Sequence, residues 1–258
     1  MQMKKTTIKN VYNYLNEIAP FNRALSYDNA GLLAGDSNGR VSRILLSLDI
    51  TFEVISEAVR EKSDLIVSHH PVLFEPIKSV TENDKIYHLI KNDVAAICAH
   101  TNLDIAEDGL NDLLFNMLNL NEMKWLSVDN SQVIGRWGRL SAPVSTRDFA
   151  IKVKRLLNAN VVRYVEGCHF VKNVAVVTGA GGSDYKEALL CGADTLVTGD
   201  AKYHEFLDAY EAGFNIIEAG HFATENIILP VLKKKLEEKF TELEVIISKA
   251  HRNIIEIV

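Results

Sequence analysis

The 258-residue sequence has only three cysteines, Cys98, Cys168 and Cys191, and no C-x-x-C pair. An odd and widely spaced set argues against a disulfide framework and against a cysteine-based zinc site. All three cysteines lie in or beside apolar segments, which predicts small buried side chains. We therefore expect any metal bound by this chain to have nitrogen and oxygen ligands.

The sequence also lacks a long apolar run and a basic stripe. Its first residues become amphipathic within one helical stretch, so they do not resemble a signal peptide or a membrane helix. The net charge is −6, and the densest basic stretch, Lys233–Lys235, is followed at once by Glu237 and Glu238. This pattern is typical of a solvated helix face. We expect a cytoplasmic protein that binds neither membranes nor nucleic acid.

Two common catalytic signatures are missing as well: no G-x-S-x-G elbow and no Walker sequence is present. The loop Thr178–Ser183 is rich in glycine, but Asp184 stands where the third glycine of a dinucleotide fingerprint belongs. Such a loop either forms a tight strand-to-helix turn or binds an anionic group of a substrate through its N–H groups.

Short apolar segments alternate with helical patterns along most of the chain. Residues 43–48, 64–68 and 94–98 are typical of buried strands, and residues 51–62 and 81–92 have helical periodicity. This alternation predicts an α/β fold with mostly parallel sheets. Further helices are expected at 6–18 and 108–118, a looser stretch at 120–145, and renewed alternation from 146 onwards.

The two halves of the sequence resemble each other. An offset of 130 residues places Asp64–Ser68 over Asp194–Thr198 and the strand 43–48 over 173–178 without a gap. All βαβ units are somewhat alike, but two blocks in the same order favour a duplication. We therefore expect two similar α/β lobes with a metal site between the lobes. The predicted first lobe is 1–126 plus 222–258, and the second is 127–221, with no inserted middle domain.

A second repeated block carries the chemistry. At an offset of 121 residues, His100 and Asp104 match His221 and Glu225, so each half follows a strand with His-x-x-x-carboxylate. If a helix starts there, the two side chains share one face and can hold the same ion. Two such halves would bring imidazoles and carboxylates together around one point.

A histidine pair makes the two halves unequal. His69 and His70 follow a predicted strand and precede Pro71, whereas Gly199 and Asp200 occupy the matching place. Adjacent residues in extended backbone point in opposite directions, so one ion rarely takes both. Two ions about 3.5–4 Å apart could take one each, which predicts a dinuclear centre.

The remaining histidines are weaker candidates. His88 lies within a predicted helix, and His169 and His251 have no carboxylate four residues away, so no functional role is expected for these three. His204 lies just past a predicted strand end. It is a candidate for proton transfer or for supporting a metal ligand.

These motifs are similar to the signature of the Nif-three-like family, many of whose members carry the name GTP cyclohydrolase 1 type 2 homolog. The resemblance runs in order over nearly the whole chain. It is carried by Asp28–Leu32, Ser68–Pro71, His100–Asp104, Gly135–Gly138, Thr198–Asp200 and Gly220–Glu225.

The resemblance implies two divalent metal ions per chain and a ring-shaped homohexamer. Carried over by position, the metal ligands are His69, His70, Asp104, His221 and Glu225, with His100 at the site as a ligand or beside one. The ligand types suit Zn, Fe, Mn, Ni or Co.

The function that we expect from the sequence is a metal-dependent hydrolase acting on a nucleotide-like or phosphoester substrate. His100 or His204 would be its proton carrier. The alternatives are a metal-handling or regulatory protein and a protein-interaction ring without turnover.

Overall fold

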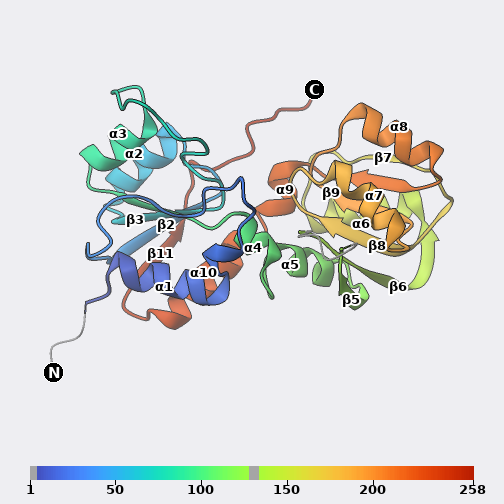
Figure 1. Ribbon diagram of the computed structural model, residues 1–258, viewed down its shortest axis with the longest axis horizontal. Coiled ribbons are helices and arrows are strands. Elements are labelled where there is room, and N and C mark those ends of the chain that lie inside the picture. Colours follow the sequence, from blue (N-terminus) through green and yellow to red (C-terminus); the bar gives the residue numbers. More distant parts are fainter. Residues whose placement is uncertain (1–4, 128–133) are drawn as a thin grey trace. The chain divides into compact units, whose positions relative to one another are not determined.

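The computed structural model of the chain describes residues 5–127 and 134–258, which form two compact units (Figure 1). The first unit comprises the described residues up to Glu107 together with Ile228–Arg252. The second comprises Asp108–Ile227 and Asn253–Val258. Each unit combines helices with its own sheet, which confirms the expected α/β class.

The unit boundaries differ from the lobe boundaries expected at 126/127 and 221/222. Helix α5 (Leu110–Met117) and strand β5 (Asn121–Trp125) belong to the second unit, because Leu114 and Phe115 pack in its core and β5 pairs with its sheet. Part of the stretch 120–145, expected to be loose, is therefore a strand pair. Residues 128–133 of that stretch lie outside the described residues.

The first sheet has the order β1-β4-β3-β2-β11. Strands β11, β2, β3 and β4 are parallel to one another, and only β1 joins antiparallel. This sheet is mostly parallel, as expected. Its strands are β1 (Gly31–Ala34), β2 (Arg43–Ser47), β3 (Leu65–Ser68), β4 (Ala95–Cys98) and β11 (Glu244–Ile247).

Helices cover both faces of the first sheet (Figure 1). On one face, apolar side chains of α2 and α3 pack against Leu45 and Ile66. On the other lie α1 and α10, and Tyr14 of α1 makes an edge-to-face contact with Phe240, the residue after α10. The helices are α1 (Ile8–Ile18), α2 (Phe52–Arg60), α3 (Lys85–Lys91), α4 (Thr101–Ile105) and α10 (Ile228–Lys239), with a 3-10 turn, η1, at Phe21–Arg23.

The second sheet has the order β5-β6-β8-β9-β10-β7 and is mixed. Strands β8, β9 and β10 are parallel, whereas β5, β6 and β7 join antiparallel. The expectation of a mostly parallel sheet is wrong for this unit, because β6 pairs antiparallel with both of its neighbours. Its further strands are β6 (Arg136–Ser145), β7 (Arg163–Val165), β8 (Phe170–Val177), β9 (Thr195–Thr198) and β10 (Asn215–Glu218).

Alternate residues of the central strand β8 enter two separate cores. Val174 and Val176 pack with α5 and α6, and Ala175 and Val177 pack with α7 and α8. This follows from the two-residue period of a strand that is covered on both faces. The helices are α6 (Thr146–Leu156), α7 (Tyr185–Leu190), α8 (Tyr203–Glu211) and α9 (His221–Glu225), with a 3-10 turn, η2, at Gly182–Asp184.

The strand registers of the two sheets agree with the repeat found in the sequence. Ile44 of β2 lies opposite Leu65 of β3, and Val174 of β8 lies opposite Thr195 of β9. Both pairs are related by the same offset of 130 residues. This agreement is consistent with an internal duplication.

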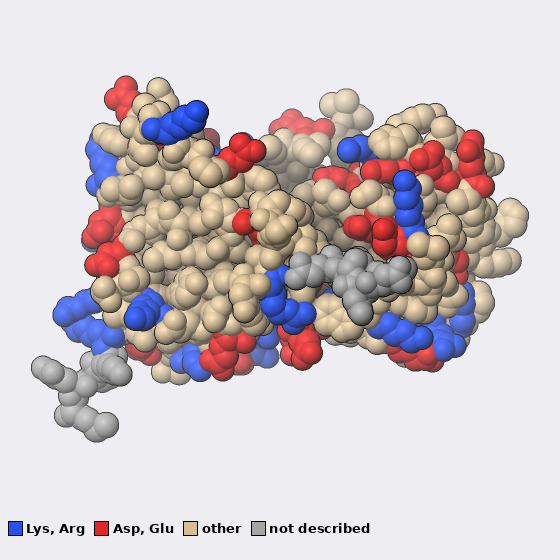
Figure 2. Space-filling view, viewed as in Figure 1, with Lys and Arg blue, Asp and Glu red and all other residues tan. Residues whose placement is uncertain are grey.

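Other expectations concern the surface and the cysteines. In the part of the chain that the structure describes, no helix is both long and apolar enough to span a membrane. Lys and Arg are interspersed with Asp and Glu on the face shown in Figure 2. Cys98 is buried, as expected, whereas Cys168 and Cys191 are half-buried.

Candidate metal centre

Three neighbouring parallel strands of the first unit end at one edge of the sheet. Ser47, Ser68 and Cys98 lie side by side at the ends of β2, β3 and β4. The residues that follow are Asp49 after β2, His69 and His70 after β3, and His100 after β4. Since ligands of open α/β sheets bind at the carboxyl ends of strands, the topology gathers these side chains at a place suited to binding.

Three imidazoles meet at this edge. The ring centroids of His69 and His70 lie 5.1 Å apart, as do those of His69 and His100, and those of His70 and His100 lie 5.5 Å apart. One ring nitrogen of each lies within 4.8 Å of the others, close enough for the three to hold a metal ion. His69 is buried, and His70 and His100 are half-buried.

Each of these rings is held by its Nδ1 atom. His69 Nδ1 lies 2.9 Å from the Ala99 carbonyl oxygen, His70 Nδ1 lies 2.9 Å from Asp49 Oδ1, and His100 Nδ1 lies 2.8 Å from Asp28 Oδ1. A carbonyl or carboxylate oxygen only accepts, so Nδ1 carries the proton and donates. In the neutral ring this leaves the lone pair on Nε2, which is the arrangement that metal-binding histidines require.

The carboxylates of this cluster differ in their environment. Burial raises the pKa of Asp28, but hydrogen bonds from His100 and Thr101 outweigh it and lower the pKa to about 2. Asp28 is therefore an ionised acceptor at neutral pH. Asp104, in α4, is buried, and its Oδ1 lies 3.6 Å from His69 Nε2.

The second unit has a smaller cluster at the carboxyl ends of β8, β9 and β10. His221, at the start of α9, places Nδ1 2.6 Å from Asp200 Oδ2 and Nε2 3.1 Å from Glu225 Oε1. Burial lowers the pKa of His221, but hydrogen bonds to Asp200 and Glu225 outweigh it and raise the pKa to about 10. A cation held by His221 Nε2 and Glu225 would take the place of that proton.

The glycine loop before η2 serves this cluster. A Cβ on Gly179, whose φ is +63°, would lie 2.3 Å from Glu225 Oε1, so only glycine lets the carboxylate approach. Three N–H groups of the loop already donate within the unit: Gly179 to Thr224 Oγ1, Gly181 to Thr198 Oγ1, and Gly182 to the Asp200 carbonyl. The close approach of Glu225 to Gly179 therefore explains the glycines of this loop better than the binding of an anion does.

The two His-x-x-x-carboxylate motifs are not structurally equivalent. Cys98 and Glu218 occupy matching ends of β4 and β10, opposite Ser68 and Thr198. His100 is the second residue after its strand and caps α4, whereas His221 is the third and opens α9. Gly220, with a φ of +89°, accommodates the extra residue. The gapless match of the two blocks is therefore off by one residue in the structure.

The predicted site residues thus fall into two sets and one outlier. The first unit groups His69, His70 and His100 and places Asp104 beside His69. The second unit joins His221 to Glu225. His204 is exposed on α8, and among the described residues no hydrogen bond or ion pair joins it to either set.

Sequence reasoning missed the carboxylates that hold the imidazoles. Asp49 and Asp200 each follow a strand, and Asp28 opens the segment Asp28–Leu32, so a search of strand ends for carboxylates would have found the first two. It also missed His251. The pKa of His251 is lowered, mainly by burial. The charge of Asp49 raises this pKa and the charge of His70 lowers it, so His251 lies within electrostatic range of the first cluster.

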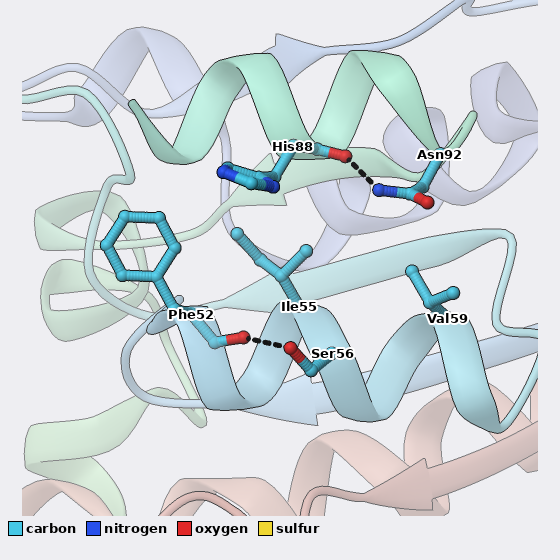
Figure 3. Close-up of a pocket in the computed structure, with 6 residues that line it drawn as sticks. All are labelled: Phe52, Ile55, Ser56, Val59, His88 and Asn92. Carbon is cyan, nitrogen blue, oxygen red and sulfur yellow. Dashed lines mark hydrogen bonds between the residues drawn. The ribbon is translucent and has the colours of Figure 1, made fainter. Parts of the chain in front are cut away.

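A groove elsewhere on the first unit has a different character. It lies between α2 and α3 and has a volume of about 380 Å³ (Figure 3). Apolar side chains of α2 make up half of its lining residues, and Asn92 donates a hydrogen bond to the His88 carbonyl at its edge. None of the six residues that line it belongs to the predicted metal set: they are Phe52, Ile55, Ser56, Val59, His88 and Asn92.

Comparison with known proteins agrees with the motifs. The Duf34/NIF3 (NGG1p interacting factor 3) family matches residues 6–254. A Clostridium perfringens protein named GTP cyclohydrolase 1 type 2 homolog is 35% identical over 260 residues, which cover 97% of this chain and 99% of that protein.

Two solved structures are similar over nearly the whole chain. The crystal structure of a Staphylococcus aureus hypothetical protein has a TM-score of 0.89 and 28% identity, covering 99% of this chain and 100% of that one. A Bacillus cereus protein related to NIF3 has a TM-score of 0.91 with the same coverages at 24% identity, and it supports the fold alone. The chain is a member of the Duf34/NIF3 family.

Proposed function

We propose that this protein binds divalent metal ions through His69, His70, His100, Asp104, His221 and Glu225 and acts as a metal-dependent hydrolase on nucleotide-like or phosphoester substrates. The observation that carries the metal assignment is the set of four imidazoles, each with Nδ1 engaged by an oxygen. Bound divalent ions would supply Lewis acidity toward a water molecule and a substrate oxygen. Two ions per chain and a homohexamer also belong to the proposal.

We assign different roles to His100 and His204, the two candidate proton carriers. His100 Nδ1 is committed to Asp28, and its ring lies among the imidazoles of His69 and His70, so we assign His100 to metal binding. His204 is exposed on α8, and we assign it no role in the reaction. Asp104 and Glu225 would contribute carboxylate oxygens, which are harder ligands than the imidazole nitrogens of the histidines.

Elemental analysis of the purified chain tests the metal assignment. We expect about two ions per chain in the wild type and their loss in a variant that carries Asp104→Ala and Glu225→Ala. Asp208→Ala, which removes an exposed carboxylate of α8, is the matched control and should retain the metal. Metal content that is unchanged in the double variant would contradict the assignment.

The hydrolase part has a separate test. The metal-loaded protein should turn over at least one member of a panel of nucleotides, phosphoesters and cyclic amides, and the double variant should not. The alternative is a metal-handling protein, which the partly exposed side chains of His70 and His221 favour, because ligands within reach of water let ions exchange. Inactivity on the panel together with metal transfer to an acceptor protein would establish that alternative.

A further inference from the structure

The carboxylate that supports His100 is more enclosed than those that support His70 and His221. The side chain of Asp28 has 0% exposure, whereas those of Asp49 and Asp200 are 53% and 50% exposed. Water can compete for the oxygens of an exposed carboxylate and can replace a lost hydrogen bond. It cannot do so for a carboxylate that is completely enclosed.

Asp28 also holds the backbone from which His100 projects. Its Oδ1 accepts from His100 Nδ1, and its Oδ2 accepts from both the N–H and the hydroxyl of Thr101. The Thr101 oxygen in turn accepts from Leu25 N at 2.9 Å. The start of α4 and the ring of His100 are thus fixed by one carboxylate from a distant part of the sequence.

A second contact fixes the same junction. Asn102 Oδ1 accepts from the His100 N–H at 2.9 Å, and Asn102 Nδ2 donates to the Ala19 carbonyl at 2.7 Å. The backbone at this junction is therefore held by Asn102 as well as by Asp28, whereas the hydrogen bond that orients the His100 ring comes from Asp28. Because Asn102 also holds the junction, the effect of Asp28 on the ring can be distinguished from its effect on the start of α4.

We propose that Asp28 is a positioning residue for metal binding: through its hydrogen bond with Nδ1 it fixes the orientation of the His100 ring before a metal arrives. It contributes more to metal affinity than Asp49 or Asp200, which support His70 and His221. This inference rests on the metal-binding part of the proposed function and is independent of any turnover. Outer carboxylates of this kind typically change metal affinity by 10–100-fold.

Zinc affinity of the full chain, measured by competition with a chelator, tests the proposal. In Asp28→Asn one oxygen must serve both His100 and Thr101, so we expect zinc to bind about 10–100-fold more weakly. Asp49→Asn and Asp200→Asn should weaken binding by less than about tenfold, because water can replace the lost contact. Histidine-selective 15N NMR of the metal-free Asp28→Asn protein should show that the His100 ring no longer holds one tautomer.

Thr101→Val is the control for a purely structural role. It removes the hydroxyl contacts with Asp28 and Leu25 but leaves the His100–Asp28 hydrogen bond. It should lower the melting temperature and change zinc affinity by no more than about twofold. Unchanged affinity in Asp28→Asn would overturn the inference alone, whereas absence of zinc binding in the wild type would overturn the metal assignment together with it.

Discussion

The strand-to-helix junctions after β4 and β10 carry the same motif and use it differently. After β10, His221 and Glu225 lie on one face of α9 and contact each other directly. After β4, His100 caps α4 and turns to Asp28, while Asp104 lies beside His69. One residue, Gly220, separates the two cases. In this chain a histidine and a carboxylate four residues apart therefore contact each other only where the helix includes both.

The largest effect that we expect follows from a substitution outside α9 that separates Glu225 from His221. Gly179→Ala would place a methyl group 2.3 Å from Glu225 Oε1 at a φ of +63°. The carboxylate must move away from His221, and zinc affinity should fall by more than about 100-fold, beyond the range for outer residues. The melting temperature should also decrease, because a non-glycine residue at this φ costs about 1–3 kcal/mol.

Gly192→Ala is the matched control for the free-energy cost of placing a non-glycine residue at a positive φ. Gly192 also has a positive φ, +89°, but no atom of the described residues lies within 4 Å of the place that a methyl group would take there. This variant should show the loss of stability without the loss of zinc affinity. Equal zinc affinities in the two variants would show that Glu225 does not need the space that Gly179 leaves.

A smaller effect concerns the buried acids of the two units. Hydrogen bonds keep Asp28 ionised, whereas burial, together with the nearby charges of Glu187 and Glu205, raises the pKa of Asp184 from 3.8 to about 7. The folded state thus holds a proton that the unfolded state releases above about pH 4. The stability linked to Asp184 is complete below that pH and is lost as the pH rises through about 7.

Asp184→Asn removes this dependence because the amide does not ionise. Between pH 5 and pH 8 the wild type loses about 2–3 kcal/mol of the stability linked to Asp184, so the variant should gain roughly 5–10 °C in melting temperature relative to it. Asp208→Asn, an exposed change on α8, should follow the wild type at both values of pH. A pH profile of Asp184→Asn parallel to wild type would contradict the assignment.

The smallest effect is expected at His204. Its side chain is exposed on α8 and joins neither histidine cluster, so His204→Ala should change zinc affinity by no more than about twofold. The same competition assay measures it, with His221→Ala as the positive control. A tenfold loss in His204→Ala would restore the sequence-based interpretation of this residue as part of the site.

Much of this fold follows from local patterns in the sequence. Apolar segments such as 43–48 and 64–68 predicted the central parallel strands, and the 130-residue offset anticipated the registers of β2–β3 and β8–β9. The antiparallel pairing of β5 with β6 was not predicted. Every residue of strand β5 is exposed, so its sequence lacks the apolar signal of a buried strand.

The candidate site, too, could be predicted only in part from the sequence. The spacing of His100, Asp104, His221 and Glu225 identified residues that the structure places in the two clusters. The one-residue shift at Gly220 was hidden, because the two blocks align without a gap. Asp28 was hidden for another reason: it lies 72 residues from His100, and no local pattern reports a hydrogen bond over that separation.

The engaged Nδ1 atoms have a consequence for the entropy of binding. A histidine that is free to rotate loses about 0.5–1.5 kcal/mol of rotamer freedom when a ligand immobilises it. In this protein His69, His70, His100 and His221 are already held by hydrogen bonds before any ion is present. The ordering cost therefore falls on folding, and an arriving cation meets rings whose conformational entropy has already been lost.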